Sequence, residues 1–302
     1  MAAEDMQEFA GQLLRNEPMA RHTSWRVGGN VDTWFRPSSL NDLVAFMATL
    51  DDAEPVYWVG LGSNLLIRDG GVRGVMISVQ DALGDIENLG AGRVRAGAGV
   101  ACTVFARHCV RQGLGPAEFF AGIPGTIGGA LAMNAGAFGG ETWEVVETVE
   151  TIDRGGNIRT RSPAEYRISY RQVDGPEGEW FIGGTFRFTE NFATSMDKVK
   201  TLVNERKEKQ PLGLPSCGSV FRNPAGDHAA RLIESAGLKG FVLGGAVVSD
   251  KHANFIINEN DATAADIEAL IKHVQQVVHS THGVELQREV HILGESLATN
   301  DE

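Results

Sequence analysis

Cysteine is scarce in this chain of 302 residues: Cys102, Cys109 and Cys217 are the three, and they form no C-x-x-C pair. An odd number of separated cysteines excludes a disulfide scaffold and a structural zinc site, and it favours a reducing compartment. His279 and His282 could face one metal ion, but no nearby Cys or carboxylate completes a ligand set. We therefore expect no metal.

Long apolar runs and basic blocks are also missing. No stretch is long enough to cross a bilayer, and the opening MAAEDMQEFAGQLL has no apolar signal core. The net charge is −12, and no broad Lys/Arg-rich block offers a surface to nucleic acid. We predict a cytoplasmic protein that binds neither membrane nor nucleic acid, and that holds any anionic ligand by local groups.

Two phosphate-binding signatures are absent as well. No G-x-x-x-x-G-K-[ST] motif is present, which disfavours a P-loop enzyme. The stretch GLGSNL at 60–65 begins like G-x-G-x-x-G but has leucine where the third glycine belongs. Its two glycines, followed by Ser63 and Asn64, can still expose successive backbone N–H groups to an anion. An ordinary turn after a strand is the alternative, and this stretch alone favours it.

Glycine, by contrast, is abundant: 37 of the 302 residues are glycine, about twice the average usage of roughly 7%. The densest stretch is AGIPGTIGGALAMNAGAFGG at 121–140. Its glycines are Gly122, Gly125, Gly128, Gly129, Gly136, Gly139 and Gly140. The interleaved apolar residues argue against a flexible linker, because linkers are polar. Glycine-rich turns of this kind suit a large planar cofactor with a pyrophosphate tail.

Periodicity predicts a mixture of helices and strands. We expect helices at 39–50, 102–114, 198–209, 227–240 and 263–279, strands at 55–60, 74–79, 93–99 and 180–188, a hairpin from 145–153 to 157–161, and two short strands within 244–258. The order lacks the strict alternation of a doubly wound sheet. The chain is therefore predicted to be α+β with more than one domain, the second starting near residue 196.

The loop SCGSVFRNP, which begins at Ser216, offers three candidate reactive groups: the thiol of Cys217 and the hydroxyls of Ser216 and Ser219. No G-x-S-x-G surrounds Ser219, and no histidine has a context that makes it the partner of Cys217. A hydroxyl can still donate a proton when its conjugate base is stabilised nearby, and Arg171 and Glu289 are candidates for that role. A solvated strand face is the alternative for Glu289, and the pattern alone favours it.

A series of motifs, in order along nearly the whole chain, resembles the UDP-N-acetylenolpyruvoylglucosamine reductase family. These are HTSWRVGG (22–29), GLGSNLLIRDGG (60–71), FFAGIPGTIGGALAMNAGAFGGE (119–141), YR (170–171), KQP (209–211), GSVFRNP (218–224), ARLIESAGLKG (230–240), GGAVVSDKHANFIIN (244–258) and LQREVHILG (286–294). The combination of IPGTIGGA, GSVFRNP and a terminal REV strand is specific.

The resemblance implies a two-part α+β FAD-binding module at 1–195, of the vanillyl-alcohol-oxidase-like type, and a smaller α+β substrate-binding domain at 196–302. The last strand, at about 284–294, would return Glu289 to the site. FAD would be the cofactor and NADPH the reductant. The implied cofactor-binding residues are Gly60, Leu61, Gly62, Ser63, Asn64, Gly122, Ile123, Pro124, Gly125, Thr126, Ile127, Gly128 and Gly129.

The resemblance also implies the chemistry, in which the enolpyruvyl group of UDP-N-acetylglucosamine enolpyruvate is reduced to give UDP-N-acetylmuramate for peptidoglycan. Hydride from flavin N5 would reach the methylene carbon, and Ser219 would protonate the adjacent carbon. Arg171 and Glu289 would flank the enol intermediate, Glu289 with a raised pKa. The implied substrate-binding residues are Tyr170, Lys209 and Asn223. Such an enzyme serves cell-wall biogenesis, cell shape and cell division, and we expect a monomer.

Two features depart from the commoner family pattern. Arg222 occupies the position of the lysine in F-K-N-P, so a cation is kept. The chain also fits a shorter subgroup that lacks an inserted loop over the substrate. The alternatives are an FAD-dependent oxidase of the same flavin fold acting on an alcohol or sugar, and a non-catalytic nucleotide-binding protein. Such oxidases often tether FAD through a histidine, and no matching histidine motif is found.

Overall fold

The first part of the protein is a four-stranded sheet with one covering helix. A computed structural model describes residues 9–297. The strands, in spatial order, are β1 (Gln12–Pro18), β2 (Asn30–Arg36), β5 (Val72–Ser78) and β3 (Val56–Val59). The short strand β4 (Leu65–Ile67) lies between β3 and β5 in the chain and does not belong to this sheet. Helix α1 (Leu40–Met47) begins at Ser39, whose side chain accepts a hydrogen bond from the Asp42 N–H, as the predicted N-cap requires.

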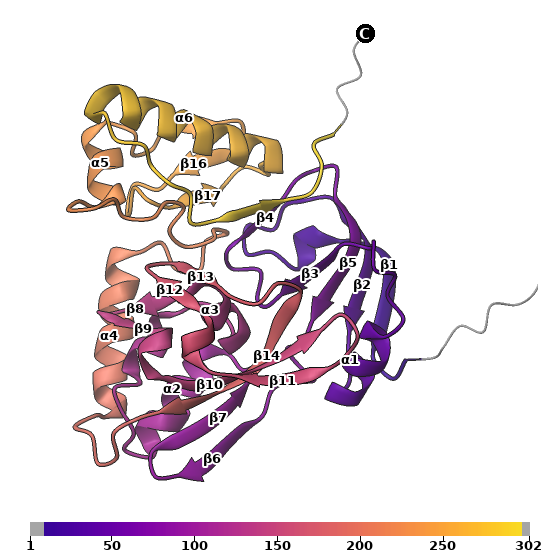
Figure 1. The fold of residues 1–302 in the computed structure, drawn as a ribbon. Coiled ribbons are helices and arrows are strands. Elements are labelled where there is room, and N and C mark those ends of the chain that lie inside the picture. Colours follow the sequence, from indigo (N-terminus) through magenta and orange to yellow (C-terminus); the bar gives the residue numbers. More distant parts are fainter. Residues whose placement is uncertain (1–8, 298–302) are drawn as a thin grey trace, which may run out of the picture.

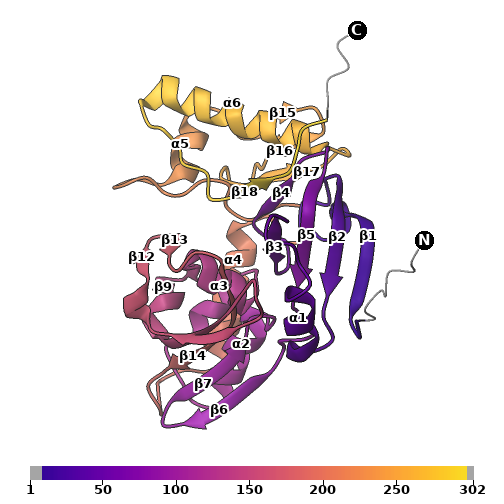
Figure 2. The same ribbon diagram turned by 45° about the vertical axis from the view of Figure 1, so that its right-hand side comes forward.

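The second part is a five-stranded antiparallel sheet. Its order is β11 (Ile158–Arg161), β10 (Val146–Asp153), β14 (Glu179–Arg187), β7 (Arg93–Gly97) and β6 (Ile86–Gly90). Three helices, α2 (Cys102–Arg111), α3 (Ile127–Met133) and α4 (Met196–Lys209), accompany it. Apolar residues of both sheets, such as Phe35 and Ile182, share one core with α1, which lies between the two parts (Figure 2).

The third part lies at the top of Figure 1, where α6 covers a small sheet. The sheet has the order β15 (Val242–Leu243), β16 (Ala246–Val248) and β17 (Ile256–Asn258), and its helices are α5 (Ala229–Ser235) and α6 (Ala264–His282). Thr263 and Asp266 form the predicted capping box of α6, and Gly283 ends the helix at a φ of +68°. No helix within residues 9–297 has the length and apolar character of a membrane span.

Segments distant in the chain fasten the third part to the first. Strand β18 (His291–Leu293) pairs in parallel with β4, with His291 opposite Leu65. Trp25 is fully buried in the core of the third part, where its Nε1 donates to the carbonyl of Ile256 at 2.7 Å. Arg68 and Glu268 form a two-pronged ion pair at 2.8 and 3.0 Å. These contacts fix where the C-terminal segment meets the first part.

The predicted helices and strands form, with two informative differences. The last strand was expected at about 284–294, but regular pairing covers only His291–Leu293, because residues 287–290 lie against the 218–224 loop instead of a strand. Helix α4 was expected to open the second domain. Its Val199 packs in the core of the second part, whereas the C-terminal core begins at Cys217. We therefore propose a domain boundary after α4, near residue 210.

Candidate active site

A cradle of backbone forms where the 60–64 loop meets the start of α3. A Cβ on Gly60 would lie 2.6 Å from the Thr126 hydroxyl, so the two loops approach as closely as glycine permits. Gly62 has a φ of +60° and packs against the carbonyl of His22. Thr126 caps α3 by accepting a hydrogen bond from the Gly129 N–H at 3.4 Å. Both predicted glycine loops therefore build one structure.

This cradle presents backbone donors that have no acceptor within residues 9–297. They are the N–H groups of Leu61, Gly62, Ser63, Asn64, Gly125 and Thr126. The next backbone donors, at Ile127 and Gly128, are paired with carbonyls of residues 100 and 98. The unpaired N–H groups are therefore confined to the two loops of the cradle. Several unpaired N–H groups in two adjoining loops favour an anion with several oxygens. The set fits a dinucleotide pyrophosphate.

A groove of about 200 Å³ continues from the cradle between the first and second parts. Its walls come from both sheets and from α3, with Gly60, Thr126, Gly128 and Gly129 among the lining residues. Trp58 and Trp180 also line the groove and stack on each other with ring centroids 5.8 Å apart. A narrow slot with glycine at one end and aromatic walls suits an extended, partly planar cofactor.

Arg171 is presented by a tight hairpin. Strands β12 (Arg167–Ser169) and β13 (Gln172–Asp174) leave Tyr170 and Arg171 as a two-residue turn, with Arg171 at a φ of +57°. The Arg171 Nη2 donates to the carbonyl of Gly136 at 3.0 Å, and its Nε donates to Glu289 Oε1 at 3.2 Å. The Tyr170 ring stands 4.8 Å from the guanidinium carbon. Three elements thus hold one guanidinium.

Glu289 joins the cradle to the loop that carries Ser219. Its carbonyl accepts from the side-chain amide of Asn64 at 3.1 Å, and its N–H donates to the carbonyl of Val220 at 2.8 Å. Its side chain is only 14% exposed. Burial raises the pKa of the Glu289 carboxyl, although the charges of Arg171 and Arg222 oppose that shift. The pKa of Glu289 is therefore shifted upward, the direction that the family resemblance implies.

The Ser219 loop is held from behind by Asn254. The Asn254 side chain accepts from the Phe221 N–H at 3.0 Å and donates to the Phe221 carbonyl at 2.8 Å, while its own carbonyl accepts from Val220 at 2.9 Å. Asn254 is 3% exposed, so these bonds replace solvent. Ser219 is half-buried immediately before this clamp. The next residue, Val220, accepts the Glu289 N–H through its carbonyl at 2.8 Å.

The other two groups of the loop have no such setting. Cys217 is buried beneath the cradle, its Sγ 3.3 Å from the carbonyl of Leu65, and burial raises its pKa to about 12. It therefore remains a thiol at neutral pH, unsuited to nucleophilic attack. The Ser216 hydroxyl bonds to the carbonyl of Leu214 at 3.4 Å. The settings of Cys217 and Ser216 leave Ser219 as the candidate of the three, and its role stays a prediction.

Of the predicted substrate-binding residues, Tyr170 contacts Arg171, whereas Lys209 and Asn223 lie outside this contact network. Lys209 is exposed at the last residue of α4, and Tyr170 is 43% exposed. Asn223 is exposed, and its Oδ1 accepts from the Ala229 N–H at 3.1 Å at the start of α5. No hydrogen bond within residues 9–297 links Lys209 or Asn223 to Arg171 or Glu289. Their roles remain predictions.

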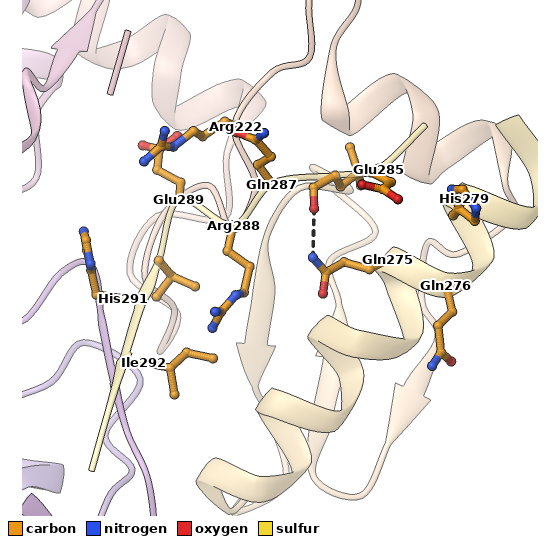
Figure 3. A pocket seen from close by; sticks show the side chains of 12 residues that line it. Arg222, Gln275, Gln276, His279, Glu285, Gln287, Arg288, Glu289, His291 and Ile292 are labelled. Carbon is orange, nitrogen blue, oxygen red and sulfur yellow. Dashed lines mark hydrogen bonds between the residues drawn. The ribbon is translucent and has the colours of Figure 1, made fainter. Parts of the chain in front are cut away.

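A second, larger hollow of about 700 Å³ lies between α6 and the segment 285–292 (Figure 3). Arg222 and Glu289 meet at one end of the drawn residues, whereas Glu285 and His279 lie at the other. Gln275 fixes the far wall by donating to the Leu286 carbonyl at 2.8 Å. Arg222 thus places the cation that replaces the family lysine next to Glu289. No group of three or more His, Cys, Asp and Glu in residues 9–297 could hold a metal ion.

Sequence reasoning missed Asn134 and Asn254. Asn134 follows α3 at a φ of +47°, is 2% exposed, and gives its carbonyl to Arg171 Nη1 at 3.3 Å. Asn134 lies inside the motif at 119–141 and Asn254 inside the motif at 244–258, but neither is among the predicted site residues. Their signal was the residue type: asparagine adopts positive φ readily and offers both a donor and an acceptor when buried.

Replacing Glu289 by glutamine should make the protein more stable at alkaline pH. Because the native pKa lies above the ordinary 4.5, the native state holds a proton that the unfolded chain releases, so the free energy of unfolding falls as pH rises through that interval. Glutamine removes this loss and still accepts from Arg171. We expect a melting temperature higher by on the order of 2 °C at pH 8.

The gain should shrink as the pH is lowered toward 5. The exposed Glu285, in the same segment, provides the matched control Glu285→Gln for loss of one negative charge. Scanning calorimetry from pH 5 to pH 8 measures both variants. A Glu289→Gln protein that is less stable than the parent at pH 8 would show that the ion pair with Arg171 outweighs desolvation.

Comparison with known proteins assigns the two halves of this architecture. The family model described as "FAD binding domain" matches residues 31–162, and the model described as "UDP-N-acetylenolpyruvoylglucosamine reductase, C-terminal domain" matches residues 210–293. The first range contains the cradle, and the second contains Ser219 and Glu289. The predicted α+β FAD-binding module and its following domain are confirmed.

Relatives match over nearly the full chain. The UDP-N-acetylenolpyruvoylglucosamine reductase of Alkalilimnicola ehrlichii is 56% identical and covers 98% of this chain and 99% of its own. That of Methylococcus capsulatus is 52% identical, with 95% of each chain covered. The crystal structure of the reductase from Thermus caldophilus aligns with a TM-score of 0.79 at 29% identity, covering 94% of this chain and 99% of its own. The chain therefore belongs to the UDP-N-acetylenolpyruvoylglucosamine reductase family of FAD-containing oxidoreductases.

Proposed function

We propose that the chain reduces the enolpyruvyl group of UDP-N-acetylglucosamine enolpyruvate to give UDP-N-acetylmuramate, with NADPH as reductant. The reaction would belong to peptidoglycan precursor synthesis and hence to cell-wall formation and division. One observation carries the proposal. The backbone of Glu289 is bonded both to Asn64 of the cradle and to Val220, the residue after Ser219, so one segment would hold the proposed cofactor site, the Glu289 carboxyl and the proposed proton donor.

Bound FAD, once reduced by NADPH, would supply the hydride that the methylene carbon of the substrate accepts. The unpaired N–H groups of the two glycine loops would hold the pyrophosphate, and the groove that Trp58 and Trp180 line would hold the remainder. These donors belong to a fixed backbone, so they need little reorganisation when the anion arrives. The relatives' names and the family assignment favour this reductase over the alternative flavin oxidase.

The side chains then divide the remaining work. Addition of hydride to one carbon of the double bond leaves an electron pair at its neighbour, which spreads into the substrate carboxylate. Arg171 would face that carboxylate with a guanidinium already fixed by Gly136 and Glu289. Ser219 would give its proton to the neighbouring carbon, completing the saturated product. Glu289 would act beside the enol in its protonated form, which burial favours by raising the pKa of the carboxyl.

The nucleotide sugar would lie toward the exposed groups of the third part. Lys209 at the end of α4 offers a cation for a phosphate, and Asn223 has its amide N–H₂ free of the bond that its Oδ1 makes to Ala229. Tyr170, half-exposed beside Arg171, offers an aromatic face. These three assignments extend the proposal beyond the reacting carbons.

The direct test is NADPH oxidation by the purified yellow protein with and without UDP-N-acetylglucosamine enolpyruvate. We expect absorbance at 340 nm to fall only when the enolpyruvyl substrate is present, with UDP-N-acetylmuramate appearing in equal amount. Steady NADPH oxidation that needs oxygen and not the substrate, or oxidation of an alcohol or sugar with oxygen as acceptor, would instead support the flavin oxidase.

The cradle predicts a variant that loses the cofactor. Gly62→Ala places a side chain at a φ of +60° and against the carbonyl of His22, so the 60–64 loop must move. We expect protein purified without added FAD to be colourless, with the dissociation constant for FAD raised at least about 10-fold, as 1.4 kcal/mol of lost binding requires. Absorbance at 450 nm and calorimetric titration of deflavinated protein measure this.

Gly226→Ala is the matched control, because Gly226 also has a positive φ, of +76°, but no atom within 4 Å of the added Cβ. It carries the same kind of backbone strain without the clash. A yellow Gly62→Ala protein with unchanged FAD affinity would contradict the cradle as the pyrophosphate site.

A further inference from the structure

Asn134 stands at the junction of the cofactor loop and the Arg171 hairpin. Helix α3 is capped at its start by Thr126 of the cradle and at its end, eight residues later, by Asn134, whose φ and ψ of 47° and 52° are left-handed. The short helix is therefore a rigid spacer, with the cradle at one end and Asn134 at the other. Its Ile127 and Leu131 are fully buried, which fixes the helix in the core.

From that position the side chain of Asn134 forms hydrogen bonds both to the Arg171 hairpin and to the segment 141–143 that follows α3. Its Nδ2 donates to the carbonyl of Ser169, two residues before Arg171, at 3.1 Å, and to Glu141 Oε2 at 2.7 Å. Its Oδ1 accepts from the Trp143 N–H at 3.1 Å. The other oxygen of Glu141 lies 3.9 Å from Arg171 Nη1. Every polar atom of this buried side chain is used.

The backbone of the same residue completes the arrangement. The left-handed turn at Asn134 directs its carbonyl to Arg171 Nη1 at 3.3 Å, and the carbonyl of Gly136 follows at 3.0 Å from Nη2. The Arg171 guanidinium therefore bonds to backbone carbonyls at the end of α3, while the side chain of Asn134 bonds to Ser169 in β12, the strand that leads to Arg171. Neither group of contacts requires substrate or cofactor.

We propose that Asn134 is a positioning residue that sets the Arg171 guanidinium relative to the cofactor loop. The inference rests on the proposed function, in which Arg171 receives the substrate carboxylate. Asn134 itself touches no reacting atom and acts through the hairpin and through Glu141. Its effect should therefore fall on the step that uses Arg171 and spare cofactor binding.

Asn134→Gly isolates the side chain. Glycine keeps the left-handed backbone and its carbonyl contact without strain, and it removes the bonds to Ser169, Glu141 and Trp143. We expect the rate of flavin reoxidation by the enolpyruvyl substrate to fall about 10- to 100-fold, the cost of a displacement of about 1 Å in a positioned group. The rate of flavin reduction by NADPH should change less than about 3-fold.

Asn191→Gly is the control, because Asn191 is an exposed asparagine with a φ of 52°, so the same substitution is made in the same backbone conformation. Stopped-flow absorbance at 450 nm follows the two half-reactions separately in the holoenzyme, and thermal unfolding monitors folding. Equal losses in both half-reactions, or in both variants, would overturn the positioning role and leave a general structural one.

A double-mutant cycle with Arg171→Met separates this inference from the function on which it rests. If Asn134 acts through Arg171, adding Asn134→Gly to Arg171→Met should slow substrate reduction less than about 2-fold further. Full additivity would overturn the inference. An Arg171→Met protein that reduces substrate at the parental rate would instead overturn the proposed role of Arg171, whatever Asn134 does.

Discussion

Ser219→Ala should lower turnover of the enolpyruvyl substrate by about 10²-fold or more while NADPH still bleaches the flavin. Loss of a positioned proton donor typically has that cost, and 10²-fold corresponds to about 2.7 kcal/mol in the barrier. The loop should keep its shape, because Asn254 holds the backbone of Val220 and Phe221, and Ser219 takes no part in that clamp. Rapid-mixing measurement of each half-reaction distinguishes the two effects.

Ser216→Ala is the matched control, with the same substitution three residues earlier in the same loop. The Ser216 hydroxyl makes only a weak bond to Leu214 at 3.4 Å, so turnover should stay within about 2-fold of the parent. Normal turnover in Ser219→Ala together with loss of turnover in Cys217→Ala would contradict the assignment of Ser219. It would also be hard to reconcile with a thiol whose pKa is about 12.

Arg171→Met is expected to have the other large effect, a loss of about 10²- to 10³-fold in substrate reduction. Removing one fixed donor at the site of developing charge has a comparable cost in other enzymes. The change also leaves Glu289 without its ionic partner, so the pKa of Glu289 should rise further, since Arg171 is a main influence lowering it. The activity that remains should therefore persist to higher pH.

Arg171→Lys tests geometry apart from charge. An ammonium cannot bond to Gly136, Asn134 and Glu289 in one plane as the guanidinium does, so we expect recovery of much less than the full rate. Arg167→Met, at an exposed arginine of the same hairpin, controls for the loss of a positive charge. Equal rates in Arg171→Met and Arg167→Met would contradict the role of Arg171.

Local features of the site were predictable from sequence because their cause is local. Each of the two glycine loops depends on glycines that are neighbours in the chain, although their meeting does not, and the cap of α6 depends on Thr263 and Asp266, three residues apart. Helix and strand periodicity likewise placed most elements within a few residues. The raised pKa of Glu289 followed only from the family resemblance, since the strand pattern by itself favoured a solvated carboxylate.

Long-range contacts could not be predicted in the same way. The bond from Asn134 to Ser169 spans 35 positions and the clamp from Asn254 to Phe221 spans 33. Nothing in the flanking residues indicates either partner. The C-terminal segment was expected to be one strand. Its partner from 218 to 224 is an irregular loop, so regular strand pairing begins only at His291. Helix α4 packs through Val199 into a core that also contains Phe120, a residue far from it in the chain.

The burial of Trp25 has a consequence for synthesis on the ribosome. Its hydrogen bond to Ile256 joins residues 231 positions apart, and Arg68 reaches Glu268 across 200. The C-terminal core includes the indole of Trp25. During synthesis this side chain must therefore remain unpacked until almost the whole polypeptide has left the ribosome. Such distant contacts slow folding and prolong the time in which apolar surface is open to aggregation.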